Sequence, residues 1–238
     1  IEVTVLDPLV LALESIQNIE SERKRENIAV YAETDWQFSP VMTLNAAVRL
    51  ESETEAFKSV GFSVFSGDGY FDINASTRYD VALAKLGLRV VINPRHRVGL
   101  TVSRGYRAGF ATTSGEVDPE FLWNYELAFR SFWPRFDTLA NLNFYYYDWR
   151  DQQITRQFGL VALTSNIGRS EAWGGELSLR STPFPGLSIG ASMGYTKTKL
   201  LEAGEFPELE GNEFRDAPRW SAGLWSRYTW DSGFFVGG

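Results

Sequence analysis

Aromatic residues recur in three pairs at a spacing of ten positions, and this spacing constrains the fold of the chain more than any other feature. Ten residues of β-strand rise about 33 Å, and a tilt of about 40° reduces this to about 25 Å, the height of the apolar band of a membrane β-barrel. Aromatic rings favour the two membrane–water boundaries. The spacing therefore predicts membrane-spanning strands, with lipid-facing aromatic girdles formed by Trp123, Trp133, Phe136, Tyr146, Trp220 and Trp230.

Side chains within these segments alternate between apolar and polar, which is the period of a strand with two different faces. From position 187 onward, one face carries Leu187, Ile189, Ala191, Met193 and Tyr195, and the other carries Ser188, Gly190, Ser192, Gly194 and Thr196. In a barrel wall the first set faces lipid and the second faces a wet lumen. Two residues break the pattern, because Ser226 falls on the apolar phase and Trp225 falls on the polar phase.

Composition excludes several classes of protein. The longest purely apolar run, from Leu9 to Leu13, is too short for a membrane helix. The mean hydropathy of −0.21 is that of a soluble protein, but alternating strands lower this average in membrane barrels as well. A net charge of −7 and a pI near 4.9 argue against nucleic acid as a partner, since phosphate binding requires clustered cations.

Short and long connections alternate along the chain between about ten strand-length segments. The short ones contain Pro, Gly, Asn or Asp, which supply the backbone angles of tight turns, and they cover residues 39–40, 93–95, 134–135, 182–186 and 231–233. The long ones cover roughly residues 52–78, 107–119, 150–170 and 199–217. This asymmetry is typical of an up-and-down outer-membrane barrel, with short periplasmic turns and long extracellular loops.

The sequence divides into two parts. Residues 1–25 are the least readable, and we interpret them as an extracellular loop or a strand remnant. Residues 26–238 are predicted to form part of an all-β, antiparallel transmembrane barrel. Because the last turn is followed by only about five residues of a new strand, we expect the chain to be a fragment of a longer protein.

A series of short motifs in the barrel region occurs in a specific order. The motifs are Leu86–Arg89, Arg104–Phe110, Pro119–Glu120, Asn124–Glu126, Tyr145–Ile154, Glu171–Leu177 and Ala217–Trp220. Each is weak alone, but together they resemble the C-terminal half of the barrel of TonB-dependent outer-membrane receptors. The resemblance covers roughly residues 27–236.

This resemblance implies a fold and a function. Such receptors are 22-stranded barrels closed around an N-terminal plug, and they take up scarce nutrients across the outer membrane of Gram-negative bacteria. Ferric siderophores are the commonest ligands; haem, cobalamin and sugars are others. Uptake is driven by the inner-membrane TonB complex, which pulls on an N-terminal box. We expect this chain to lack the plug and the box, and the partners implied for the whole receptor are outer-membrane lipid, a nutrient ligand and the TonB complex.

Four residues near the predicted extracellular mouth are candidate ligand contacts: Tyr106, Arg107, Tyr147 and Trp149. The alternative is that they form the outer girdle and anchor the loops. No catalytic residue, metal ligand or cofactor is predicted, since His96 is the only histidine and no cysteine is present. The acidic residues between positions 202 and 213 fit a solvated loop better than a Ca²⁺ site, because their spacing does not match an EF-hand.

Three other functions remain open from the sequence. A passive porin-type channel would share the barrel but have neither plug nor energy coupling. An outer-membrane enzyme would need a catalytic cluster, and none is visible in the sequence. A soluble β protein used for adhesion would not expose lipid-facing apolar strands.

Overall fold

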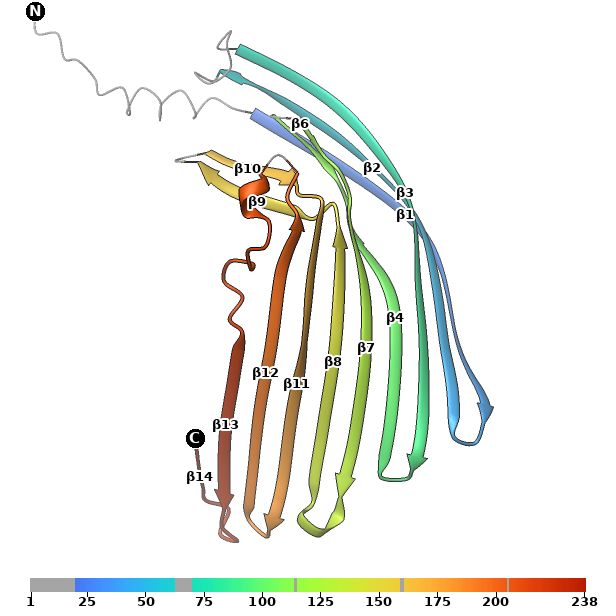
Figure 1. Cartoon of the computed structure of the whole chain (residues 1–238), viewed down its shortest axis with the longest axis vertical. Coiled ribbons are helices and arrows are strands. Elements are labelled where there is room, and N and C mark those ends of the chain that lie inside the picture. Colours follow the sequence, from blue (N-terminus) through green and yellow to red (C-terminus); the bar gives the residue numbers. More distant parts are fainter. Residues whose placement is uncertain (1–19, 63–69, 114, 159–160, 205) are drawn as a thin grey trace, which may run out of the picture.

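The computed structural model describes residues 20–62, 70–113, 115–158, 161–204 and 206–238. Ten antiparallel strands form one curved sheet in which neighbours along the chain are neighbours in space (Figure 1). Its strands are β1 (Glu20–Ser39), β2 (Met42–Phe62), β3 (Tyr70–Asn93), β4 (His96–Arg107), β7 (Glu120–Trp133), β8 (Thr138–Arg150), β11 (Arg169–Phe184), β12 (Leu187–Glu202), β13 (Trp220–Thr229) and β14 (Phe235–Gly237).

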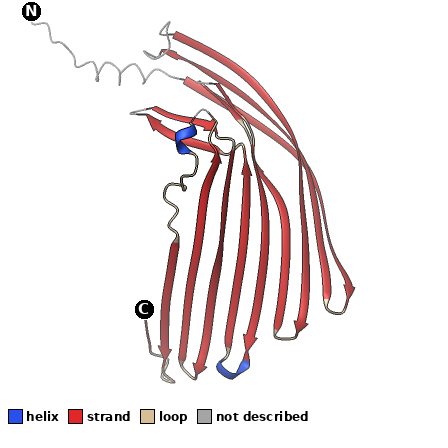
Figure 2. Ribbon diagram, viewed as in Figure 1, coloured by secondary structure: helices blue, strands red, loops and turns tan. Residues whose placement is uncertain are grey.

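Two small hairpins interrupt this order without changing it. The first pairs β5 (Phe110–Thr112) with β6 (Gly115–Val117), and the second pairs β9 (Gln153–Phe158) with β10 (Val161–Asn166). Among the described residues, helical structure is limited to two short 3₁₀ turns, η1 (Pro134–Phe136) and η2 (Pro207–Leu209) (Figure 2). In the described part of the chain, no helix has the length and apolar character needed to cross a membrane. The prediction of an all-β, up-and-down antiparallel fold is confirmed.

The tight turns gather at one end of the sheet, here the turn end, and the two hairpins lie at the opposite end, here the loop end (Figure 1). Side chains hold the turns: Asn93 Oδ1 accepts hydrogen bonds from the backbone N–H groups of Arg95 and His96, at 2.9 and 3.0 Å. Ser39 Oγ accepts from the N–H of Met42 at 3.0 Å. Short polar side chains at these positions bond locally to the backbone and favour turns over continued pairing.

Strand register aligns the apolar residues into rows across the sheet. One row crosses eight neighbouring strands through Met42, Val90, Val98, Phe129, Leu142, Leu177, Met193 and Ala222. The face that carries this row is called the outer face, and the opposite face, which is polar, is called the inner face. Large apolar side chains stay exposed on the outer face, including Leu224 at 81% and Leu100 at 51%. An apolar surface of this extent requires a covering partner.

The buried side chains of the described residues are concentrated at the loop end rather than in the middle of the sheet. Ile167 and Ala203 are 0% exposed, and Val117 is 2% exposed. Polar residues are buried there as well, with Glu55 at 1% and Ser59 at 0%. The protein therefore has its packed core where the hairpins fold against the inner face, while the rest of the wall is one sheet thick.

The strands extend further into the predicted loops than expected. Residues 52–62 continue β2 and residues 70–78 belong to β3, and the two strands pair as far as Phe62 opposite Tyr70. Alternate side chains are buried along this part of β2, and the strand contacts β5, so packing stabilises strand structure in a largely polar segment. Residues 20–25 belong to β1, while residues 1–19 lie outside the described part of the chain.

The position of Trp225 on the polar face of its strand has a local explanation. It lies on the inner face opposite Gly190 in the β12–β13 register. A Cβ atom at position 190 would lie only 2.2 Å from the indole Nε1, so the glycine makes room for the ring to lie flat against the neighbouring strand. The tryptophan and the glycine form a complementary pair on the inner face.

Candidate functional site

The wall of the sheet divides toward the loop end. Pairing between β3 and β4 stops at Lys85 opposite Ser103, whereas β4 continues to pair with β7 as far as Arg107 opposite Glu120. Above this point β1, β2 and β3 bend away from the other strands (Figure 1). The β5–β6 hairpin, which prolongs β4 and β7, packs against β2 and β3. The candidate site is the mouth formed at this end of the inner face.

Glu55 is the main anchor of the hairpin. Its Oε1 lies 3.3 Å from Arg23 Nη1 and accepts a hydrogen bond from the backbone N–H of Ala111 at 3.2 Å. Its Oε2 accepts from Arg25 Nε at 3.1 Å. Arg23 also donates to the carbonyl oxygen of Ala111 at 2.8 Å. A buried carboxylate is tolerated only when it is paired and hydrogen-bonded, and these contacts meet that requirement.

This anchor lies beyond the apolar band of the wall. Thirteen residues separate Glu55 from Met42 at the turn end, which corresponds to about 33 Å of height for a strand tilted by about 40°. The hydrogen bond to Glu55, together with the charges of Glu55 and Glu53, raises the pKa of Arg25 above its ordinary value despite partial burial. The guanidinium therefore stays charged at any physiological pH.

Two more carboxylates continue the same line on β2. Glu53 and Glu51 are 6% and 9% exposed, and both accept from the hydroxyl of Tyr106, at 3.1 and 2.8 Å. Arg25 Nε lies 3.0 Å from Glu53 Oε1, and Arg49 Nε donates to Glu51 Oε2 at 2.5 Å. Side chains two residues apart on a strand share a face, so Glu51, Glu53 and Glu55 form one acidic row on the inner face. Arg23, Arg25 and Arg49 balance the charge of this row, and the Tyr106 phenol donates a hydrogen bond to it.

A glycine and a tyrosine set how closely the hairpin approaches β3. A Cβ atom on Gly109 would lie 2.5 Å from the hydroxyl oxygen of Tyr79, so any larger residue would force the hairpin away. Tyr79 donates to Glu116 Oε1 at 2.9 Å. Burial, with a further contribution from the charge and hydrogen bond of Glu116, raises the pKa of Tyr79 to about 12. The phenol is therefore a permanent donor to the hairpin.

The two hairpins are joined by amide hydrogen bonds. The side-chain amide of Gln153 donates to the carbonyl oxygens of Ala108 and Asp118, each at 2.9 Å, and its backbone N–H donates to Glu120 Oε2 at 2.7 Å. Asn166 donates from its amide to the carbonyl of Asp118 at 2.9 Å and accepts from the Asp118 N–H at 2.7 Å. The loop end is therefore one connected layer rather than a set of independent loops.

Four aromatic rings form a continuous ladder on the inner face near these hairpins. Tyr145 stacks on Tyr147 with ring centroids 4.9 Å apart, and Tyr147 meets Trp149 edge-on at 5.4 Å. Trp149 meets Phe214 edge-on at 5.7 Å. The three rings of β8 lie opposite small residues of β11 in the register, namely Gly174, Ala172 and Ser170. The small residues leave room for the rings along the wall.

The connection between β12 and β13 supplies the fourth ring. The backbone N–H of Phe214 donates to Thr198 Oγ1 on β12 at 2.8 Å, which directs this connection onto the inner face. Arg219 forms an ion pair with Glu213 that closes the segment, with Nε donating to Glu213 Oε2 at 2.9 Å. This hydrogen bond lowers the pKa of Glu213 below its ordinary value. The ion pair holds the residue next to Phe214.

The family and the fold follow from comparison with known proteins. The sequence from residue 5 to residue 238 matches the family of TonB-dependent receptor-like β-barrels. The chain belongs to this family. The receptor fold is also seen in solved structures: the ferric yersiniabactin uptake receptor FyuA from Yersinia pestis superposes with a TM-score of 0.78 at 20% identity, over 90% of this chain and 33% of that one.

Two further solved structures have the same fold. The siderophore receptor PiuA from Acinetobacter baumannii gives a TM-score of 0.71 at 14% identity, over 89% of this chain and 32% of PiuA. The copper transporter OprC gives 0.69 at 12% identity, over 87% of this chain and 33% of OprC. The chain thus spans about a third of the length of each of these proteins. The predicted family is confirmed; the predicted total of 22 strands stays a prediction.

The structure of this receptor barrel separates the four predicted mouth residues into two groups. Tyr147 and Trp149 lie together in the aromatic ladder. Tyr106, on β4, donates a hydrogen bond to the carboxylate row of β2. Arg107 is its neighbour in the chain, with Nη1 3.7 Å from Glu120 Oε2 and the side chain 61% exposed. All four lie at the loop end. Their contact with a ligand stays a prediction.

The sequence reasoning missed several residues of the mouth. Glu53 and Glu55 fall within the long connection predicted over residues 52–78, although with Glu51 they continue the polar phase of β2. Arg25 falls within residues 1–25, the part of the sequence that is least readable. Phe214 carries no signal in the sequence, because only the folded connection brings it to Trp149.

The six predicted girdle residues lie near strand ends. Trp123, Tyr146 and Trp220 are close to the loop end of β7, β8 and β13, while Trp133, Phe136 and Trp230 are close to the turn end. Five are at least 36% exposed. Trp220 packs against Tyr195 at 4.6 Å between ring centroids. Among the described residues, no group of three or more His, Cys, Asp or Glu side chains is arranged to hold a metal ion.

Proposed function

We propose that this chain is the loop-bearing part of an outer-membrane receptor that takes up a scarce nutrient, with a ferric siderophore as the leading substrate class. The observation that carries the proposal is the aromatic ladder of Tyr145, Tyr147, Trp149 and Phe214 at the mouth of a receptor barrel. Flat π faces bind flat organic groups and apolar ligand surfaces. Siderophores with aromatic chelating rings fit this surface.

The outer face supports the membrane location. An exposed apolar row that crosses eight strands would cause aggregation in water, whereas contact with lipid hydrocarbon is favourable for it. Hydrocarbon also requires that backbone polar groups are paired, and the sheet provides this pairing. The six girdle residues then lie at the two lipid boundaries, and the loop end faces the cell exterior of a Gram-negative bacterium. Solved neighbours with siderophore and copper substrates support uptake of a metal-bearing nutrient but do not select one.

Ligand binding by the intact receptor tests the proposal. Purified receptor is titrated with ferric siderophores of catecholate, phenolate and hydroxamate type, and with haem and cobalamin, while tryptophan fluorescence is recorded. We expect an aromatic ferric siderophore to bind most tightly. Replacing Trp149 by Ala should weaken binding by about two- to tenfold, which corresponds to the loss of one or two aromatic contacts. Trp149→Phe should retain most of the affinity. Trp123→Ala, on the outer face, is the matched control.

Uptake by cells separates the receptor from the passive channel. An energy-coupled receptor stops accumulating ligand when the inner-membrane proton gradient is collapsed or when the TonB complex is removed. A porin-type channel continues to equilibrate its solute under both conditions. Persistent uptake without energy, together with no saturable ligand binding, would overturn the proposed function.

A further inference from the structure

The loop-end half of β3 is paired on one side only. Its pairing with β2 runs without a register shift from Met42 opposite Val90 to Phe62 opposite Tyr70. Its pairing with β4 ends at Lys85 opposite Ser103. Figure 1 shows this half of β3 on the outside of the three strands that bend away from the wall. Residues 72–80, on the side that β4 has left, are called the free edge.

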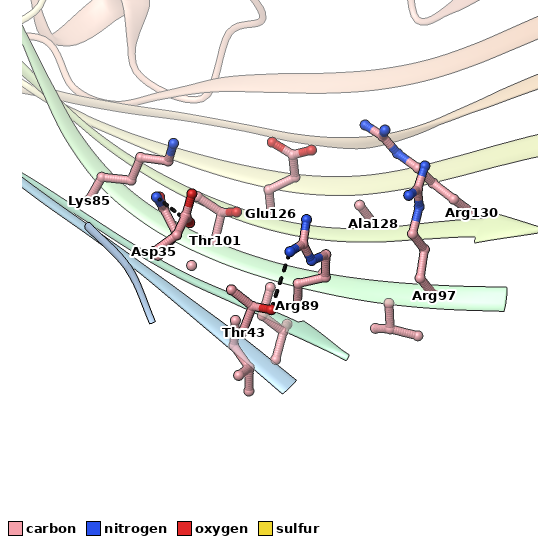
Figure 3. Close-up of a pocket in the computed structure, with 15 residues that line it drawn as sticks. Asp35, Thr43, Lys85, Arg89, Arg97, Thr101, Glu126, Ala128 and Arg130 are labelled. Carbon is pink, nitrogen blue, oxygen red and sulfur yellow. Dashed lines mark hydrogen bonds between the residues drawn. The ribbon is translucent and has the colours of Figure 1, made fainter. Parts of the chain in front are cut away.

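The wall is continuous between the turn end and this edge. Side chains of β3 and β4 line one shallow hollow of about 430 Å³ on the inner face, and Figure 3 shows Lys85 and Arg89 from β3 with Arg97 and Thr101 from β4. Lys85 is also the last residue of β3 that pairs with β4. The free edge begins beyond this level.

The backbone groups of even-numbered residues point toward the free side. Val91 donates its N–H to the carbonyl oxygen of Val41, so odd-numbered residues of β3 direct their groups toward β2, and the direction alternates along a strand. Arg104 Nη1 on β4 donates to the carbonyl oxygen of Ala82 across the gap at 3.2 Å, which agrees with this direction. Within the described part of the chain, no strand pairs with residues 72, 74, 76, 78 and 80 on this side.

The free edge lacks the usual protection of an exposed strand. Natural edges are commonly short or interrupted by Pro or a β-bulge. Residues 70–84 contain no Pro, and the β2–β3 register has no bulge. The edge extends over about 27 Å from Asp72 to Asp80. It lies beyond the apolar band, because Glu55 pairs with Thr77. Such an edge is a template for an added strand.

The two faces beside the free edge differ in chemistry. Asp72, Arg78 and Asp80 are exposed on the outer face, and Arg78 Nη2 lies 3.2 Å from Asp80 Oδ1. Asp72 lies opposite Val60 on β2, so no cation faces it there. On the inner face, Ile73 is half-buried. Because cross-strand neighbours share a face, a matching strand has a basic residue opposite Asp72 and an apolar residue opposite Ile73.

A second copy of this protein does not fit the free edge. Two copies in one membrane are related by a rotation about the membrane normal, and the same surface of each then meets the other. Both edges would rise in the same direction, which excludes antiparallel pairing. Identical N–H groups would also face each other at the same height. The edge therefore requires a different chain.

We propose that the free edge binds an extended, basic segment of an extracellular polypeptide, which joins the sheet as an antiparallel strand. The segment takes the place that β4 would occupy if its pairing with β3 continued. Main-chain hydrogen bonds supply affinity, and alternate side chains supply specificity. The extracellular origin of the segment rests on the proposed function, which places the loop end outside the cell. The pairing itself depends only on the edge.

Peptide binding to the intact receptor tests the pairing. The probe is a capped nine-residue peptide in which Val alternates with Lys or Thr. When Val faces inward, the N–H groups of the Lys and Thr residues point to the free edge, and those of the Val residues point to solvent. N-methylation of the Lys and Thr residues should therefore weaken binding at least about tenfold, since several hydrogen bonds are lost. N-methylation of the Val residues is the matched control and should leave the affinity within about twofold.

Two receptor variants test the edge from the other side. Ser76→Pro removes an N–H on the free side and leaves the pairing with β2 intact, because Pro is tolerated at strand edges. It should weaken peptide binding at least about fivefold, whereas Ser76→Thr should not. Asp72→Lys should weaken binding of this peptide and strengthen binding of a version with Glu in place of Lys. Ferric siderophore affinity should be the same in all three variants, so this inference and the proposed function can fail separately.

Hydrogen exchange in the receptor without peptide shows whether the edge is open. We expect the N–H groups of residues 74, 76 and 78 to exchange at least about tenfold faster than those of 73, 75 and 77, which face β2. Equal protection would mean that another part of the receptor or another copy covers the edge, and this result overturns the proposal. Equal binding of the two methylated peptides overturns it too, as does no binding of the probe at millimolar concentration.

Discussion

The hydroxyl of Tyr106 on β4 lies 2.8 Å from Glu51 Oε1 on β2, so its side chain reaches across β3 at the level where the wall divides. A second carboxylate, Glu53, lies 3.1 Å from the same hydroxyl. One phenolic proton is therefore shared between two acidic side chains of the same row. This contact fastens the base of the β5–β6 hairpin to the wall.

Removing this hydroxyl should loosen the hairpin without unfolding the barrel. Tyr106→Phe removes a hydrogen bond to charged acceptors, which contributes about 1.5 kcal/mol or somewhat more. We expect amide hydrogen exchange in residues 110–117 to accelerate about tenfold in the intact receptor, while exchange in β8 and β11 is unchanged. Equal exchange in both proteins would show that the hairpin is held by other contacts.

Glu55→Gln should release the hairpin more completely. The side chain is 1% exposed, and its loss of charge leaves Arg23 and Arg25 without their main partner. Because both guanidinium groups are partly exposed, we expect the free energy that holds the hairpin closed to fall by about 2–3 kcal/mol. This value is near the lower end of the range for a broken buried ion pair. The measurement is the rate of protease cleavage in residues 108–119. Glu22→Gln, which breaks the exposed pair with Lys24, should leave the rate within the range of the unmodified receptor.

Two adjacent residues of β12 report the two faces of the wall. Ala191 lies opposite Leu224 on the outer face, and Ser192 lies opposite Gly223 on the inner face. Ala191→Arg should destabilise the barrel in phospholipid by about 2–4 kcal/mol, whereas Ser192→Arg should cost much less because its charge meets water. Equilibrium unfolding of the intact receptor in bilayers gives both values. Equal costs would contradict the assignment of the faces.

The connection between β12 and β13 should loosen in acid. The ion pair with Arg219 lowers the pKa of Glu213 below its ordinary value of 4.5, so its contribution is fully present above pH 4.5 and is lost as the pH falls through the lowered pKa. We expect hydrogen exchange in residues 211–218 to increase between pH 5 and pH 3, after correction for the intrinsic pH dependence of exchange. The Glu213→Gln variant should show high exchange at both pH values. If exchange in the unmodified protein does not increase over this pH range, the ion pair does not hold the connection in place.

The sequence was sufficient for the wall but not for the mouth. Alternation and aromatic spacing depend on local geometry, so the strands around Leu187–Tyr195 and the tight turns were predicted from neighbouring residues alone. The mouth depends on contacts between distant segments. Glu55 and Ala111 are 56 positions apart, and Phe214 meets Trp149 only because a connection folds onto the inner face. Polar residues 53–61 resemble a loop until the hairpin that buries them is known.

The separation of β3 from β4 has a consequence for how such a protein varies. The two strands pair from the turn end as far as Lys85 and Ser103. Beyond this level, the gap between them is spanned by a short insertion between β4 and β7. Changes in the length or sequence of that insertion would reshape the mouth and leave the paired wall intact. The shape of the entrance and the stability of the wall can thus evolve as independent traits.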